Sequence, residues 1–315
     1  MHMMTHKEYF YLDVIVIIIC LYSPDVNSQQ WQWANHIASY ESTGGTQGVC
    51  DNKGNFYITG EFEGDTCHFM TQTLIRKGNN SIFLAKYDKD GNELWVQQFD
   101  VDYFAPDYYD AIADIVVDDF GFLYITGKFY SRAKFGSDTL RSLDGDIFIA
   151  KFATDGNCSW AKKAGGYGED GGSGLAIDSL RNVYVCGRIF STSLFDTISV
   201  EPGEFLAKYD SNGNCIWVKK EVSSNDIGIP FIGITGMKIF QNNLFACAYE
   251  NSSFFTVDTV SINHPGKFGV LLCCFNLEGT IKWLSEGISI GAGIGFTSQQ
   301  MFLVMFILQV VFLIL

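Results

Sequence analysis

The sequence predicts an all-β protein that is built from repeated blocks of four antiparallel strands. Three observations support this prediction. Tryptophans recur about every 60 residues, a repeat length typical of propellers and solenoids, at Trp33, Trp95, Trp160, Trp217 and Trp283. Two short motifs recur in step with these tryptophans. No segment carries a sustained apolar period of 3.6 residues, so we expect almost no helix.

The first motif is a short aromatic and β-branched stretch that follows Gly or Asn and ends in a small residue. Its four copies are residues 54–60, 121–127, 182–187 and 243–248. The second motif reads I-F-L-A-K-Y-D in its first copy, and its four copies are residues 82–88, 147–152, 205–210 and 271–276. Such runs, bounded by turn residues, are typical of β-strands.

The first block illustrates the four strands in order. We expect strand a near residues 48–51, strand b at 56–62, strand c at 82–87 and strand d through 94–97. The a–b turn at 51–55 and the c–d turn at 88–92 contain Gly and Asn, which adopt positive φ at low cost, as tight hairpins require. The c–d turn also resembles a calcium loop, but its ligand spacing is wrong for an EF-hand, so we interpret it as a hairpin turn.

Four antiparallel strands per block, repeated radially, are typical of a β-propeller blade. The blocks resemble the SBBP (seven-bladed β-propeller) repeat, whose pattern is roughly G-N-x-Y-V-T-G followed by D-I-F-L-A-K-Y-D-x-x-G-N-x-x-W. The resemblance covers about residues 32–287. Block four departs from it, because Cys273-Cys274 replaces Ala-Lys and Glu278-Gly279-Thr280 replaces the Gly-Asn turn. The family's repeated residues are structural, so the resemblance implies a fold and no activity.

The expected fold is therefore a β-propeller of four four-stranded antiparallel blades plus an incomplete fifth, within residues 29–287. The blades are expected at residues 44–99, 110–163, 171–221 and 230–286, with residues 31–38 as a lone strand d that would close the ring. Because the family has more blades than this chain holds, we expect an open or truncated ring, or a strained closure.

Both ends of the chain differ from the repeats. Residues 1–28 are expected to be a signal peptide, because Lys7 precedes an apolar run and small residues precede a cut after Ser28. This predicts a secreted or cell-surface protein. Residues 288–315 form an apolar tail without the repeat pattern. Back-translated and read two bases further on, part of it can encode V-F-G-Y-V-Y-I-T-G-C-F, the missing strand-b motif, so we interpret the tail as a frameshift. The alternative is a weak membrane segment, since about 20 residues are needed to span.

Composition restricts the function classes. The net charge of −14 argues against nucleic-acid binding, because phosphates attract a basic surface. No catalytic sequence motif, metal-ligand cluster or cofactor-binding motif is present, so we expect no catalysis, no metal and no cofactor. The nine cysteines form no C-x-x-C pair and are expected to be small buried residues, although an oxidising export route permits disulfides. The repeated Lys86, Lys151 and Lys208 are expected to link blades.

The connections are more informative for binding. In this fold the a–b and c–d turns share one end, and the b–c and d–a connections share the other. The second set differs in every block, and variable loops on a rigid scaffold are where binding sites are usually built. Two d–a connections combine aromatic rings, carboxylates and glycines. The candidate ligand-binding residues there are Asp102, Tyr103, Asp107, Tyr108, Tyr109, Asp110, Tyr167, Glu169 and Asp170.

Two functions fit these features. The first is a non-catalytic secreted or cell-surface scaffold that binds a protein or a carbohydrate through these loops. The alternative is an extracellular glycan hydrolase or lyase that uses loop carboxylates such as Asp102, Asp107 or Asp110 as acid and base. A hydrolase needs two carboxylates about 5–10 Å apart, and no spacing in the sequence establishes such a pair. The scaffold interpretation is therefore preferred.

Overall fold

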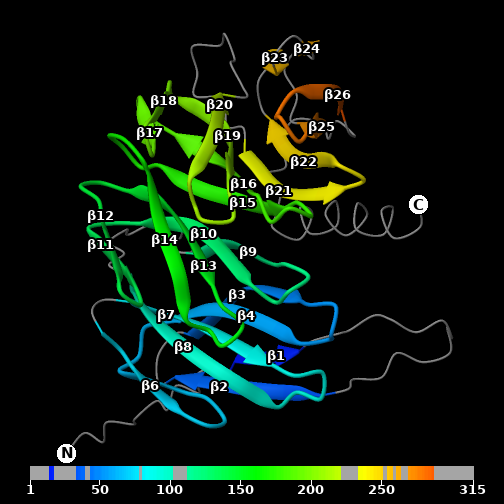
Figure 1. Ribbon diagram of the computed structural model, residues 1–315. Helices are drawn as coiled ribbons and strands as arrows, with labels where there is room; N and C mark the ends of the chain where they lie inside the picture. The colour runs from blue at the N-terminus through cyan, green and yellow to red at the C-terminus, as the bar shows by residue number, and fades with distance from the viewer. Residues whose placement is uncertain are drawn as a thin grey trace, which may run out of the picture.

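The computed structural model describes residues 14–17, 33–39, 43–77, 80–101, 112–220, 233–250, 254–257, 260–263 and 269–286. Throughout these residues the structure consists of antiparallel strands, turns and short connections, and it contains no helix (Figure 1). Four successive four-stranded meanders, here called units 1 to 4, follow one another along the chain. The all-β prediction is therefore confirmed, and none of the sheets closes on itself within the described residues.

Strands a to d follow the same order in every unit. Strands a are β3 (Thr43–Cys50), β9 (Ile112–Val117), β15 (Gly171–Ile177) and β21 (Gly233–Phe240). Strands b are β4 (Phe56–Phe62), β10 (Leu123–Phe129), β16 (Val183–Ile189) and β22 (Asn243–Glu250). Strands c are β7 (Asn80–Tyr87), β13 (Asp146–Phe152), β19 (Gly203–Tyr209) and β25 (Gly269–Asn276). Strands d are β8 (Glu93–Val101), β14 (Cys158–Gly165), β20 (Cys215–Lys220) and β26 (Ile281–Glu286).

The inner strands of each sheet are buried on both faces, which explains their continuous apolar sequences. Every residue of β13 is buried, and all residues of β10 except Lys128 are buried. Strand d in the same unit, β14, instead mixes buried, half-buried and exposed positions. This is the pattern of an outer strand with one face in contact with solvent.

The b–c connections contain a regular feature that the sequence did not reveal. Each holds a two-stranded hairpin: β5 (Thr66–His68) with β6 (Thr73–Ile75), β11 (Arg132–Phe135) with β12 (Asp138–Arg141), β17 (Ser193–Phe195) with β18 (Ile198–Val200), and β23 (Phe254–Val257) with β24 (Val260–Asn263). Two of these hairpins extend the sheet of the preceding unit, because β11 pairs with β8 and β17 pairs with β14. These connections differ in length and sequence from block to block, as expected, but share this hairpin.

The N-terminal strands form a further sheet. β2 (Ala34–Ser39) lies between β1 (Val14–Ile17) and the hairpin strand β5. β2 falls within the segment expected to be a lone strand d, and β1 belongs to the segment expected to be a signal peptide. β2 thus relates to β5 as β8 relates to β11 in the next unit, so it occupies the strand-d position before unit 1.

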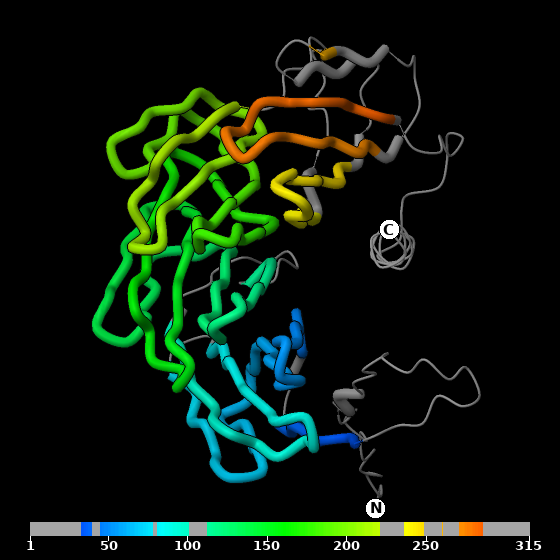
Figure 2. Tube along the Cα trace, turned by 45° about the vertical axis from the view of Figure 1, so that its right-hand side comes forward, coloured from blue at the N-terminus to red at the C-terminus, as the bar shows by residue number. Residues whose placement is uncertain are grey.

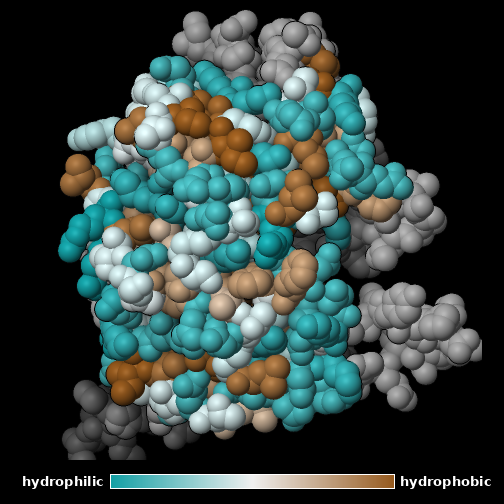
Figure 3. Space-filling model, viewed as in Figure 1, coloured by the Kyte–Doolittle hydropathy of each residue, from teal (hydrophilic) through white to brown (hydrophobic). Residues whose placement is uncertain are grey.

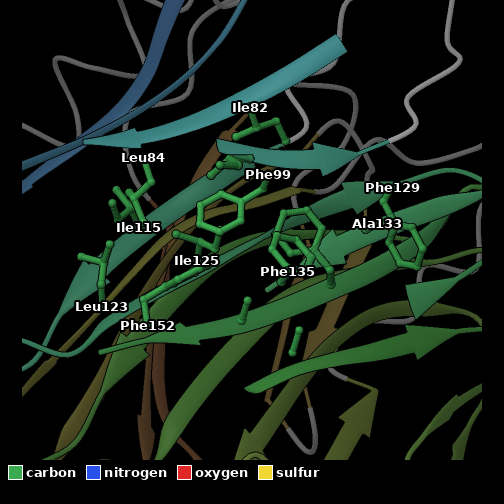
Figure 4. Packing of buried hydrophobic residues seen from close by; sticks show 14 of the residues in the cluster. Ile82, Leu84, Phe99, Ile115, Leu123, Ile125, Phe129, Ala133, Phe135 and Phe152 are labelled. Atoms are coloured by element: carbon green, nitrogen blue, oxygen red, sulfur yellow. The ribbon is translucent and has the colours of Figure 1, made fainter. Parts of the chain in front are cut away.

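The units pack face to face in an arc, and the core lies between them. Strands a of successive units contact one another and follow the concave side of the arc (Figure 2). One core cluster joins Ile82, Leu84 and Phe99 of unit 1 to Ile125 and Phe152 of unit 2 (Figure 4). Further clusters join unit 2 to unit 3, unit 3 to unit 4, and β2 to unit 1. On the face of the molecule shown in Figure 3, apolar residues lie in separate strips between hydrophilic ones.

Candidate functional site

The a–b and c–d turns form one end of the described units, here called the turn end, and their acidic groups are used within the turns themselves. Asp88 Oδ1 accepts hydrogen bonds from the backbone N–H groups of Asp90 (2.9 Å) and Asn92 (2.8 Å), and its Oδ2 accepts from Asn92 Nδ2 (2.8 Å). The hydrogen bond from Asn92 lowers the pKa of Asp88 below its ordinary value. The hairpin interpretation of this turn is confirmed, since its carboxylate oxygens already have donors.

The turn end also carries a contact that recurs between units, which we call the tryptophan clamp: the Trp of strand d in one unit covers the c–d turn glycine of the next. Trp160 lies on Gly213, where a Cβ would come within 2.9 Å of Trp160 Cδ2. Trp160 Nε1 donates to the carbonyl oxygen of Ser211 (3.2 Å), and Lys151 Nζ donates to the same oxygen (3.1 Å). The other clamps pair Trp33 with Gly91, Trp95 with Gly156 and Trp217 with Gly279.

The clamp rests on a tyrosine in strand b. The rings of Tyr124 and Trp160 meet edge to face at 6.3 Å between centroids, and Lys151 Nζ lies 5.3 Å from the Tyr124 centroid. Lys208 repeats the inter-unit bond by donating to the carbonyl oxygen of Leu277 (3.2 Å). The predicted role of the repeated lysines as links between units is confirmed for Lys151 and Lys208, so these polar groups are structural.

The opposite end, here called the loop end, carries the described part of the candidate ligand-binding site. The d–a connection from Gly165 to Asp170 lies beside the start of the b–c connection of unit 3. The N–H of Tyr167 donates to Ser191 Oγ (2.7 Å), and the N–H of Phe190 donates to Asp170 Oδ1 (2.7 Å). The predicted proximity of these two kinds of connection is confirmed here.

Asp170 organises this loop from the inside. It is completely buried, and its Oδ2 accepts from the N–H of Gly166 (2.6 Å) and from Ser193 Oγ (3.1 Å). Burial raises its pKa, although these hydrogen bonds oppose the shift. Gly166 is required at its position, because a Cβ there would come 2.5 Å from the carbonyl oxygen of Thr192. Asp170 therefore positions the loop and presents no carboxylate to solvent.

The other two candidate residues of this loop are accessible. Tyr167 is 77% exposed. Glu169 Oε2 forms an ion pair with Lys128 Nζ (3.0 Å), and the hydrogen bond from Lys128 lowers the pKa of Glu169. Burial and the charge of Glu169 raise the pKa of Tyr130 to about 12, so this phenol stays protonated at neutral pH. Glu169 is thus an ionised carboxylate that is paired with Lys128 and interacts with Tyr130.

Sequence reasoning missed a second exposed ring at this site. Phe190, the first residue after β16, is 52% exposed, and the Arg188 guanidinium lies 4.9 Å from its ring centroid. Tyr167 and Phe190 therefore belong to one surface, since the loop that carries Tyr167 is hydrogen-bonded to the segment that carries Phe190. The signal was the aromatic residue directly after strand b, which Tyr130 repeats in unit 2. We call Tyr167, Phe190, Arg188, Tyr130 and Glu169 the loop-end surface.

The remaining candidate residues, Asp102, Tyr103, Asp107, Tyr108, Tyr109 and Asp110, lie outside the described residues. Among the residues that are described, no cluster of three or more His, Cys, Asp or Glu side chains is arranged to hold a metal ion. The eight cysteines in this part of the chain form no disulfide with one another. The described segments also contain no helix that is long and apolar enough to cross a membrane. Neither a protein-family model nor a curated protein matches the chain.

Proposed function

We propose that the chain is a secreted, non-catalytic scaffold of the β-propeller type that binds a protein or carbohydrate ligand at its loop end. The fold part of the proposal is supported by four antiparallel four-stranded sheets that follow one another in an arc, with their first strands on the concave side. The resemblance of the blocks to the SBBP repeat supports it as well. The N-terminal apolar segment supports export.

The observation that carries the binding proposal is a difference between the two ends of the units. At the turn end, turn carboxylates such as Asp88 and the clamp tryptophans are used within the structure, although one ring, Phe120, is exposed there. At the loop end, the exposed rings of Tyr167 and Phe190 lie on connections held by hydrogen bonds to Asp170 and Ser191. Exposed rings with little conformational freedom provide contact area for sugar faces and peptide side chains. Arg188 and Glu169 add charges of both signs.

The non-catalytic part of the proposal is supported by the state of Glu169 and Asp170, the two candidate carboxyls that lie within the described residues. A glycan hydrolase needs one carboxylic acid that donates a proton and one accessible carboxylate. Glu169 is paired with Lys128 and has a lowered pKa, so it is a poor proton donor. Asp170 is buried and hydrogen-bonded within the loop.

The proposal is tested by screening the exported protein on a glycan array and on surface-protein extracts, with a parallel assay for released reducing ends. For a ligand found in this way, we expect Tyr167→Ala or Phe190→Ala to weaken binding about tenfold, which corresponds to about 1.4 kcal/mol. Phe120→Ala is a matched control, because Phe120 is also exposed and lies 5.2 Å from an arginine, Arg181, but belongs to a turn at the opposite end.

Two outcomes would contradict the proposal. Equal weakening by Phe120→Ala would show that binding does not depend on the loop-end surface. Release of reducing ends would show that the protein is an enzyme. Export is checked separately, because the amino terminus of the secreted protein is expected to be Gln29.

A further inference from the structure

The tryptophan clamp has an unfilled counterpart on the last described unit. In units 1 to 3 the strand-d tryptophan is half-buried beneath the turn of the following unit. Trp283 occupies the same position in β26 but is 43% exposed. Among the described residues, it is the one strand-d tryptophan that no turn glycine covers.

The aromatic platform of the clamp is nevertheless present in unit 4. The rings of Phe245 and Trp283 lie 6.1 Å apart at 58°. The corresponding pair Tyr57 and Trp95 in unit 1 lies 6.1 Å apart at 60°. Trp283 is therefore held in the geometry that receives a turn in the other units.

The polar groups around this platform differ from those in units 1 to 3. Phe245 stands where units 1 to 3 have tyrosine, and Cys274, which is 2% exposed, stands where they have lysine. Of the Trp and Lys donors that form the clamp between units 2 and 3, unit 4 therefore keeps the indole N–H of Trp283. The site on unit 4 consequently depends more on apolar contact than the equivalent sites between the other units.

The chain's own turns are already occupied. The four c–d turn glycines, Gly91, Gly156, Gly213 and Gly279, each lie against a tryptophan of the preceding strand d. Residues 287–315 contain no Asp or Asn, and so cannot supply a turn of the kind found at 88–92. Neither the described turns nor residues 287–315 thus offer Trp283 a turn of this kind.

We propose that the outer face of unit 4, formed by Trp283, Phe245 and Cys274, is a docking site for one further repeat of the same kind. The turn glycine of that repeat lies on the Trp283 indole, and the carbonyl two residues before the glycine accepts a hydrogen bond from Trp283 Nε1, as Ser211 does for Trp160. The proposal follows from continuity with an interface that the chain already forms between its own units, and it is independent of ligand binding at the loop end.

The test extends the chain by one repeat. Residues 1–298 are kept and followed by a second copy of residues 171–220, so that residues 287–298 form a connection as long as residues 221–232 between β20 and β21. The protein is labelled with 5-fluorotryptophan, and the Trp283 resonance is assigned from its loss in Trp283→Phe. The difference in its ¹⁹F shift between H₂O and D₂O reports exposure of the indole.

We expect the unextended chain to show a large solvent shift for Trp283, and the extended chain to show the small shift of Trp217. Gly213→Val in the added copy alone is the matched control, and it is expected to restore the large shift. The proposal is overturned if the shift of Trp283 is unchanged by the extension. It is equally overturned if the added copy stays unprotected in amide hydrogen exchange, because docking on unit 4 is what should order it.

Discussion

Replacing the turn glycine of one clamp should destabilise the protein more than replacing a glycine with the same backbone strain elsewhere. Gly213 has φ of 82°, and a Cβ there would come within 2.9 Å of the Trp160 indole, whereas Gly54 has φ of 79° in an a–b turn, and a Cβ there would lie 3.2 Å from Lys89 Cβ, a less severe contact. Both glycines therefore lie in the left-handed region of backbone conformation. Comparing Gly213→Ala with Gly54→Ala separates the cost of backbone strain from the cost of losing the clamp.

The expected magnitudes follow from the local contacts. An L-residue in the left-handed region costs about 1–2 kcal/mol, which is the main effect expected for Gly54→Ala, since its contact with Lys89 Cβ is milder than that of Gly213 with the indole. In Gly213→Ala the new methyl group would meet the indole at 2.9 Å, so Trp160 must move. Overpacking adds about 1–3 kcal/mol and loss of the indole hydrogen bond adds about 1 kcal/mol. We therefore expect a total cost of about 3–6 kcal/mol for Gly213→Ala.

The measurement is urea denaturation followed by circular dichroism and tryptophan fluorescence. A double-mutant cycle completes it, because the excess cost of Gly213→Ala over Gly54→Ala should disappear when Trp160 is already alanine. Equal costs of the two glycine variants would refute the reasoning. So would an excess that persists without the indole, since it would then arise from something other than the clamp.

Three other predictions concern buried polar groups. Burial raises the pKa of Glu204 from its ordinary 4.5 to about 8. Between pH 4.5 and pH 8 the native state therefore binds one proton more than the unfolded state. The free energy of unfolding should consequently fall by up to about 5 kcal/mol as pH rises from 4.5 to 8. Glu204→Gln should remove this fall in urea midpoints measured at pH 5 and pH 9. Asp178→Asn should cost about 1–3 kcal/mol in the same assay, because Asp178 Oδ2 accepts from Tyr184 Oη (3.2 Å); an unchanged midpoint would contradict this. A maleimide reagent should label exposed Cys50 but not Cys186, because Cys186 is completely buried and burial raises the pKa of its thiol. Rapid labelling of Cys186, measured by mass spectrometry, would contradict its placement.

The strands that could be predicted are those with a strong local pattern. β4 was expected at residues 56–62 and has those bounds, because its aromatic and β-branched residues end at turn glycines. β3 begins at Thr43, earlier than expected, because its glycines carry no side chain that would show an alternation. Strands with large side chains that pack in the core could therefore be recognised from the sequence. Glycine-rich strands, which contribute mainly backbone hydrogen bonds to the sheet, gave a weak sequence pattern.

The hairpins in the b–c connections were missed for two physical reasons. Strands of three or four residues are too short to establish an alternating pattern. In addition, β11 and β17 pair with β8 and β14 of the preceding unit, and no local segment reveals that pairing. A signal was nevertheless present, because a buried phenylalanine is followed by Thr and an aliphatic residue in two units, as in Phe135 with Thr139-Leu140 and Phe195 with Thr197-Ile198.

The candidate site was predictable in position but not in the roles of its residues. Asp170 and Tyr167 looked equivalent in a polar, glycine-rich loop. In the structure Asp170 is buried, because three donors converge on it, while Tyr167 is 77% exposed. Which polar residue faces inward depends on Phe190 and Ser193, which lie on a different connection, and the sequence does not show that these segments meet.

At each boundary that a hairpin crosses, the two neighbouring units contribute different features: one provides the hairpin and the other provides the end of its strand d. Unit 1 receives β11 at the end of β8, and unit 2 both provides that hairpin and receives β17 at the end of β14. Units 1 and 2 thus each provide a hairpin on one side and receive one on the other, which is a heterologous interface. Such interfaces propagate in one direction until geometry closes them. A duplicated block would therefore bring both halves of its own junction, and an array could gain a repeat without any new complementary surface having to evolve.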